Sequence, residues 1–156
     1  MPHIHDKIDF TSEVFIVYKN KVLLRKHDKY KIWLSIGGHI ELDEDPIEAA
    51  EREVLEEVGL KIEIHDSLLK YRGSREGYIE LIPPRFMNRH RINENHEHIS
   101  LVYFARSDSD NVKVSGDDIS NVWKWFDHDE LDDKEYGIND NVKFYARRAL
   151  DELFTD

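Results

Sequence analysis

The stretch from residue 45 to residue 59 carries the end signals of a helix. Asp45 suits the N-cap, Pro46 suits the first helical position, and Glu48 completes a capping-box pair with Asp45. Gly59 suits the left-handed position just past the last turn. The sequence therefore predicts a helix that begins at Pro46 and runs to residue 58.

This helix is amphipathic, so it must pack against another layer. At about 100° per residue, four apolar side chains share one stripe. They are Ile47, Ala50, Val54 and Val58. We expect the stripe to face a β-sheet.

Apolar and β-branched runs surround this helix and predict the strands of that sheet. The expected strands are 13–18, 22–24, 32–36, 61–71, 78–82, 99–105 and 121–126, with a turn at 19–21. The run ISLVYFA at 99–105 is nearly all apolar, which is typical of a central strand. A second amphipathic helix is expected at 141–154, and a short one near 127–131. The order predicts one α/β domain over residues 1–156, with a mixed sheet.

Composition limits the partners and the location of the protein. The 156 residues are 40% hydrophobic, enough for a core, and the formal net charge is −11. That charge argues against stable nucleic-acid binding and against an anionic membrane surface. Cysteine is absent, which excludes disulfides and thiolate metal sites. With no long apolar run and a polar start, the sequence predicts a soluble cytoplasmic protein.

Three glutamates of the predicted helix lie on an arc beside the apolar stripe. Glu53, Glu56 and Glu57 repel one another by a few tenths of a kcal/mol per pair, roughly. Such a cluster is either a solvated acidic face or a site for a cation. Carboxylate oxygens are the ligands that Mg²⁺ and Mn²⁺ prefer.

The spacing around these glutamates decides between the two interpretations. The stretch GHIELDEDPIEAAEREVLEEVGL, residues 38–60, resembles the signature of the Nudix hydrolases, G-x5-E-x7-R-E-U-x-E-E-x-G-U with U aliphatic, at every specified position. The chain is thus similar to a MutT-like pyrophosphohydrolase. The resemblance implies an α/β/α sandwich with a mixed β-sheet between helices, in which residues 38–60 form a loop–helix–loop.

The resemblance also implies the chemistry. Family members cleave the diphosphate linkage of a nucleoside diphosphate derivative with Mg²⁺ or Mn²⁺, and small members most often act on nucleoside triphosphates. By position, the expected metal ligands are Glu53, Glu56, Glu57 and a backbone carbonyl of Gly37 or Gly38. Arg52 resembles the arginine that orients neighbouring carboxylates, and Glu44 resembles a residue that supports the loop.

Further candidates lie outside the signature. Members often add a glutamate as base or extra ligand, and Glu97 is the candidate here, with Glu94 in reserve. On a strand, Glu97 would point opposite to His96 and His98. The pairs His3-x-His5 and His96-x-His98 are weak evidence for zinc, because neither has a third ligand at a known spacing.

The substrate contacts are expected in the most basic window of this acidic chain, residues 83–91. Arg85, Arg89 and Arg91 are candidates for a phosphate or base, and Phe86 for stacking. The alternative is a solvated loop whose arginines balance nearby acids. Tyr78 lies eighteen residues after Leu60, where tyrosine is associated with dinucleoside polyphosphate hydrolases. His39 follows the glycine pair and is either a further contact to the phosphates or an ordinary loop residue.

Two other functions remain as alternatives. A non-catalytic nucleotide-binding or sensing Nudix-like module typically loses signature ligands, whereas this chain keeps all three helix glutamates and Arg52. Isoprenoid diphosphate isomerisation on the same fold tends to need a cysteine, and this chain has none. The sequence is compatible with a monomer or a homodimer.

Overall fold

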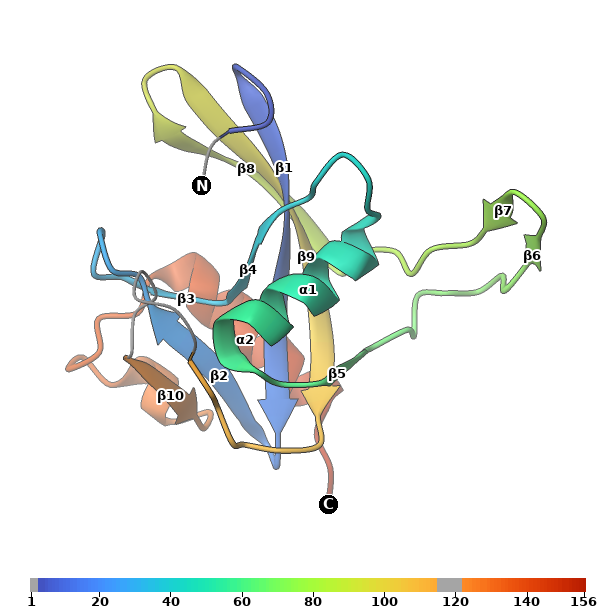
Figure 1. Ribbon diagram of the computed structural model, residues 1–156. Coiled ribbons are helices and arrows are strands. Elements are labelled where there is room, and N and C mark those ends of the chain that lie inside the picture. The colour runs from blue at the N-terminus through green and yellow to red at the C-terminus, as the bar shows by residue number, and fades with distance from the viewer. Residues whose placement is uncertain (1–2, 115–121) are drawn as a thin grey trace.

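The protein is a mixed β-sheet with a helix on each face (Figure 1). The computed structural model describes residues 3–114 and 122–156. The strands are β1 (Ile8–Tyr18), β2 (Lys21–Lys26), β3 (Trp33–Leu34), β4 (Ile36–His39), β5 (Ile62–Ile64), β6 (Ser74–Arg75), β7 (Tyr78–Ile79), β8 (Phe86–Asn93), β9 (His96–Ser107) and β10 (Trp123–Phe126). The helices are α1 (Pro46–Val58), the 3₁₀ turn η1 (Glu130–Asp132) and α2 (Asp140–Glu152).

The sheet is built around two long strands that run parallel, β1 and β9. Within the described residues its main path is β10-β2-β1-β9-β5, while β3 pairs with β2, β4 with β1 and β8 with β9. All of these other pairings are antiparallel. The parallel register places Asp9 beside His98, and the β1–β4 register places Glu13 beside Gly37.

Helix α1 has the predicted boundaries. The Asp45 carboxylate accepts from the amides of Ile47 and Glu48, and the Glu48 carboxylate accepts from the Asp45 amide, which closes the capping box. Gly59 ends the helix in the left-handed conformation. The capping residues near each end were therefore sufficient to predict where this helix begins and ends.

Each face of the sheet has its own core. Under α1 lie Val14, Ile16, Leu23, Ile36, Ala50, Val54, Val58, Leu60, Ile64, Tyr103 and Ala105. Under α2 the core includes Phe15, Phe104 and Val142. Alternate residues of β1 and β9 thus face opposite helices, as expected for strands buried on both sides. None of the helices in the described segments is long and apolar enough to cross a membrane.

Several predicted elements differ from the structure. The basic window 83–91 was expected to be a loop, but most of it forms β8, which pairs with β9. The strand was missed because much of β8 is exposed and carries charged side chains, so the sequence lacks the apolar pattern of a buried strand. The strands expected at 61–71 and 78–82 shrink to β5 and to β7 of a small hairpin. The start of the strand expected at 121–126 lies outside the described residues.

Candidate active site

Arg52 of α1 organises the carboxylates of the signature. Its Nε and Nη2 donate to both oxygens of Glu44, at 2.9 and 2.6 Å. Its Nη1 donates to Glu53 at 2.8 Å and to Glu56 at 3.3 Å, and Nη2 also donates to the His39 carbonyl at 3.0 Å. These hydrogen bonds, first the one to Glu44, raise the pKa of Arg52, and the same bond lowers the pKa of Glu44. Arg52 therefore ties the loop after β4 to the helix.

Glu53 lies in the buried face of α1 instead of beside it. Only 3% of the residue is exposed, and this burial raises the pKa of the Glu53 carboxyl despite the hydrogen bond from Arg52. Its carboxylate packs against Gly38, where a Cβ would lie only 2.4 Å from Oε1. The glycine is thus needed for the backbone of β4 to approach this carboxylate.

Glu57 is partly buried, and its inner oxygen has little compensation. Its Oε2 lies 3.2 Å from Nε of Arg25 on β2, yet this buried oxygen has no hydrogen-bond partner among the described residues. Burial raises the pKa of Glu57 to about 7, with Arg25 opposing the shift and Glu53 and Glu56 adding to it. Glu56, in contrast, keeps 58% of its side chain exposed. A divalent cation fits these residues, because the donors are hard oxygens and one buried oxygen lacks a partner.

A cavity opens on the α2 face of the sheet beside the glycine pair. Its volume is about 390 Å³, and a second cavity of about 130 Å³ shares three lining residues with it. The shared residues are Glu13, Leu34 and Ser35. The smaller cavity also reaches Gly37 and Gly38. The two cavities therefore lead from the sheet face to the glycine against which Glu53 packs.

Glu13 is a carboxylate of this cavity that the motif analysis missed. It is half-buried and accepts hydrogen bonds from Ser100 Oγ at 2.8 Å and from Ser35 Oγ at 3.3 Å. Thr11 and Ser100 share a further hydroxyl hydrogen bond at 2.7 Å. The available signal was a charged residue at the start of the apolar run EVFIVY.

The cavity is lined by aromatic and amide side chains that the sequence did not single out. The aromatic and amide residues of the lining are Phe15, His27, Tyr30, Asn88, His90, Asn139, Asn141 and Tyr145. The rings of His27 and Tyr30 stack at 4.9 Å between centroids. The cavity thus has flat apolar surface together with hydrogen-bonding groups, the composition of a small-molecule site.

The predicted residues outside the signature are spread over several places. Glu97 is held by Arg89, whose Nε lies 2.7 Å from Glu97 Oε2. Arg85 pairs with Glu152 of α2, and Arg91 lines the larger cavity. Of the three arginines, the structure therefore brings only Arg91 to the cavity among the described residues.

The two predicted aromatic contacts also lie elsewhere. Phe86 packs against Phe104, Phe144 and Tyr145, at centroid distances of 5.3 to 6.1 Å. Tyr78 is exposed on the β6–β7 hairpin and donates to Glu80. Neither residue lines the cavity.

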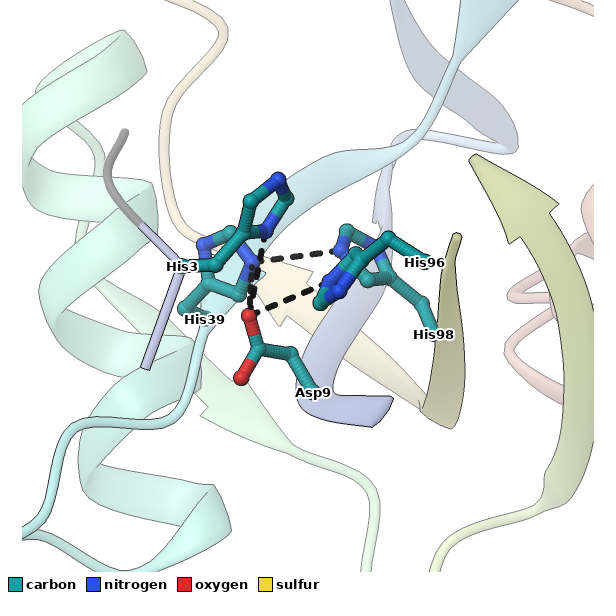
Figure 2. Close-up of side chains that lie close together, drawn as sticks. All are labelled: His3, Asp9, His39, His96 and His98. Atoms are coloured by element: carbon teal, nitrogen blue, oxygen red, sulfur yellow. Dashed lines mark hydrogen bonds and ion pairs between the residues drawn. The ribbon is translucent and has the colours of Figure 1, made fainter. Parts of the chain in front are cut away.

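The His39 side chain joins a group that the sequence did not predict. It lies with His3, Asp9, His96 and His98 (Figure 2). Only the pairs within 3–5 and 96–98 were noticed as possible ligands. The parallel pairing of β1 with β9 supplies the missing partners.

Comparisons with known proteins agree with this fold. A sequence model of the NUDIX domain matches residues 11–147. A hydrolase of the NUDIX family from Clostridium perfringens is 38% identical, with a TM-score of 0.83 over 93% of this chain and 97% of that chain. A MutT NUDIX hydrolase from Burkholderia pseudomallei is 20% identical, with a TM-score of 0.66 over 95% and 99%. An Ap4A hydrolase from C. elegans is 19% identical, with a TM-score of 0.61 over 90% of each chain.

The fold and the carboxylate helix define a hydrolase of the class that acts on acid anhydrides in phosphorus-containing compounds. Because the family match spans most of the sequence, the chain belongs to the NUDIX family.

Proposed function

We propose that this hydrolase cleaves the diphosphate linkage of a nucleoside diphosphate derivative, with a nucleoside triphosphate as substrate, in the presence of Mg²⁺ or Mn²⁺. One observation carries the proposal. The buried carboxylate of Glu53, one helical turn from the partly buried Glu57, packs against a glycine that also borders a cavity of about 130 Å³, which adjoins one of the size of a small-molecule site.

The residues that would hold the cation are Glu53, Glu56 and Glu57, with a carbonyl of Gly37 or Gly38. When bound, such an ion neutralises phosphate oxygens and acidifies a water molecule. Arg52 fixes Glu53 by its hydrogen bond at 2.8 Å and holds Glu56 more loosely, at 3.3 Å. A cation held by these carboxylates would offset their repulsion of an anionic substrate.

The cavity suggests how the nucleotide lies. We place the base between the aromatic rings of Tyr30 and Tyr145, with Asn88 as a hydrogen-bonding partner, because all three line the cavity. The phosphates then extend past Ser35 to the glycine pair. Arg91, at the cavity wall, is the arginine that we propose for the charged end of the substrate.

Glu13 is our candidate for the carboxylate outside the signature that acts as base or additional ligand. It lines both cavities and pairs with Gly37 across β1 and β4. Glu97, the residue expected in that role, is held by Arg89. A carboxylate must reach the attacking water to act as a base, and the position of Glu13 beside Gly37 supports this assignment.

The test is a panel of nucleoside triphosphates, nucleoside diphosphate sugars and dinucleoside polyphosphates, assayed with Mg²⁺, with Mn²⁺ and with chelator. Products are identified by phosphorus NMR, and released pyrophosphate is measured through added pyrophosphatase. We expect pyrophosphate from a triphosphate, a loss of several orders of magnitude in Glu57→Gln, and retained nucleotide binding in that variant. Arg91→Ala should raise KM, whereas the matched Arg89→Ala should leave it unchanged.

Two outcomes would overturn the proposal. Faster cleavage of a sugar nucleotide or a dinucleoside polyphosphate would assign a different substrate class to the same site. Nucleotide binding without turnover of any compound in the panel would favour the non-catalytic module instead.

A further inference from the structure

Five side chains from three distant parts of the chain converge next to the active-site loop. They are His3 of the N-terminal segment, Asp9 of β1, His39 of β4, and His96 and His98 of β9. Figure 2 shows the four rings gathered around the Asp9 carboxylate. One potential ligand atom from each residue lies within 4.8 Å of all the others. This group, the histidine cluster, has no role in the proposed reaction.

The spacing within the histidine cluster matches that of ligands around one metal ion. Asp9 Oδ2 lies 3.2 Å from His3 Nδ1, 3.3 Å from His39 Nε2 and 3.3 Å from His96 Nε2. The Nε2 atoms of His39 and His98 are 3.2 Å apart. In a tetrahedral zinc site, bonds of about 2.0–2.1 Å place neighbouring ligand atoms about 3.3–3.4 Å apart. All four distances agree with that edge length.

His96 provides the strongest single indication of a cation. Its Nδ1 lies 3.3 Å from the Asp6 carbonyl, which only accepts, so Nδ1 carries a proton. In a neutral ring, Nε2 then has a lone pair directed at the Asp9 carboxylate, an unfavourable contact. Nε2 is buried and has no hydrogen-bond partner in the part of the chain that the structure describes, and the residue is 3% exposed. A positive ion between Nε2 and Asp9 converts this repulsion into two bonds.

Asp9 is also held by backbone hydrogen bonds, as metal-binding carboxylates are. The residue is fully buried, and its oxygens accept from the amides of His5 at 2.7 Å and Ile4 at 3.2 Å. Burial alone would raise the pKa of Asp9, but these amides and the neighbouring His39 and His3 lower it overall. Outer hydrogen bonds of this kind orient ligands in metal sites. The carboxylate is therefore fixed and charged.

The histidines are suited to bind as neutral ligands. Burial and the neighbouring rings lower the pKa of His98 to about 4. Burial likewise lowers the pKa of His39, although Asp9 opposes the shift. Neutral imidazole is the form that coordinates metal.

We propose that Asp9, His39, His96 and His98 form a second metal site, with His3 as an exchangeable further ligand, for a transition-metal dication of the zinc class. Imidazole nitrogens favour Zn²⁺ and its neighbours over Mg²⁺, whereas the carboxylates of α1 favour hard cations. The ion would fix the N-terminal segment, β4 and β9 together. Because the His39 carbonyl also accepts from Arg52, the site would hold the loop that leads to α1.

The test uses full-length protein without a histidine tag, stripped with chelator and then dialysed. Zn²⁺ content is measured by mass spectrometry, affinity by calorimetry, and geometry from the visible absorption of the Co²⁺ form. We expect one tight equivalent of Zn²⁺ and a tetrahedral Co²⁺ spectrum, in the presence of excess Mg²⁺. Glu57→Gln, which alters the α1 carboxylates, should retain this equivalent, so the test is independent of the proposed function.

Substitutions within the histidine cluster test whether the ion binds there. His96→Gln and Asp9→Asn should each weaken Zn²⁺ binding at least tenfold, roughly the loss seen when metal-site residues are removed. His98→Gln, at a less buried position, provides a second variant if either of these fails to fold by circular dichroism. His128→Gln is the matched control, because His128 is exposed and pairs with Asp151 on α2. Absence of a tight equivalent in the wild type, or an equal loss in His128→Gln, would overturn the proposal.

Discussion

Glu57 should make the metal-free protein less stable as the pH rises, and Glu57→Gln should remove that effect. Burial raises the pKa of this carboxyl from 4.5 to about 7. Below about pH 4.5 it is protonated in both the folded and the unfolded states, so folding carries no penalty. Between the two pKa values the unfolded state releases the proton and the folded state keeps it, so the stability falls as the pH rises. The full penalty is about 3 kcal/mol, at about 1.36 kcal/mol per pKa unit.

The assay is urea denaturation of both proteins in chelator at pH 5 and pH 8. Gln resembles the protonated carboxyl, so the variant avoids the penalty at both pH values. By the linkage relation, the stability gained by Glu57→Gln is below about 1 kcal/mol at pH 5 and about 3 kcal/mol at pH 8. Glu51→Gln is the matched control, because Glu51 is an exposed glutamate of the same helix. Its difference from the wild type should not change with pH.

Added Mg²⁺ provides the second half of this test. A ligand that binds only the folded state stabilises it, so saturating Mg²⁺ should stabilise the wild type at pH 8 more than the variant. The reasoning would be refuted by a stability difference that is the same at both pH values. A variant that is less stable than the wild type at pH 8 in chelator would refute it too.

Three further variants test the support of the site. Gly38→Ala should raise the Mg²⁺ concentration for half-maximal activity about tenfold with little loss of melting temperature, because a Cβ at 2.4 Å must displace the Glu53 carboxylate. Arg52→Lys keeps the charge but loses the planar fork that bridges Glu44 and Glu53, so kcat should fall by about tenfold or more, measured with saturating Mg²⁺. Asp45→Ala removes the cap of α1 and should cost about 1 kcal/mol in urea denaturation, with kcat retained.

The parts of this protein that the sequence predicted are those with local causes. Helix α1 and its capping box depend on residues within a single stretch, from Asp45 to Gly59. The spacing of Arg52 and the three glutamates lies in that same stretch, so the family could be recognised from it. The strand ISLVYFA was predictable because its burial on both faces requires a continuous apolar run.

The parts that were missed depend on contacts between distant segments. Glu13 reaches the glycine pair only because β1 pairs with β4 in one particular register. The histidine cluster needs β1 and β9 side by side, a pairing that places Asp9 next to a residue 89 positions away. Strand β8 was read as a loop, since its exposed arginines give no alternation of apolar and polar residues. Pairing registers of this kind cannot be read from residue spacing along one segment.

The three glutamates of α1 can now be compared by what each costs the fold. Mutual repulsion amounts to a few tenths of a kcal/mol per pair, roughly, which is small beside the penalty of about 3 kcal/mol from burying Glu57. Arg52 compensates Glu53 and contacts Glu56, whereas Glu57 lies near Arg25 and, within the described residues, its buried oxygen accepts no hydrogen bond. Among the three glutamates, Glu57 therefore carries an unfavourable electrostatic free energy, the deficit, that no hydrogen bond to its buried oxygen offsets within the described residues. A cation at that position would remove the deficit, which is why we propose Glu57 as a metal ligand.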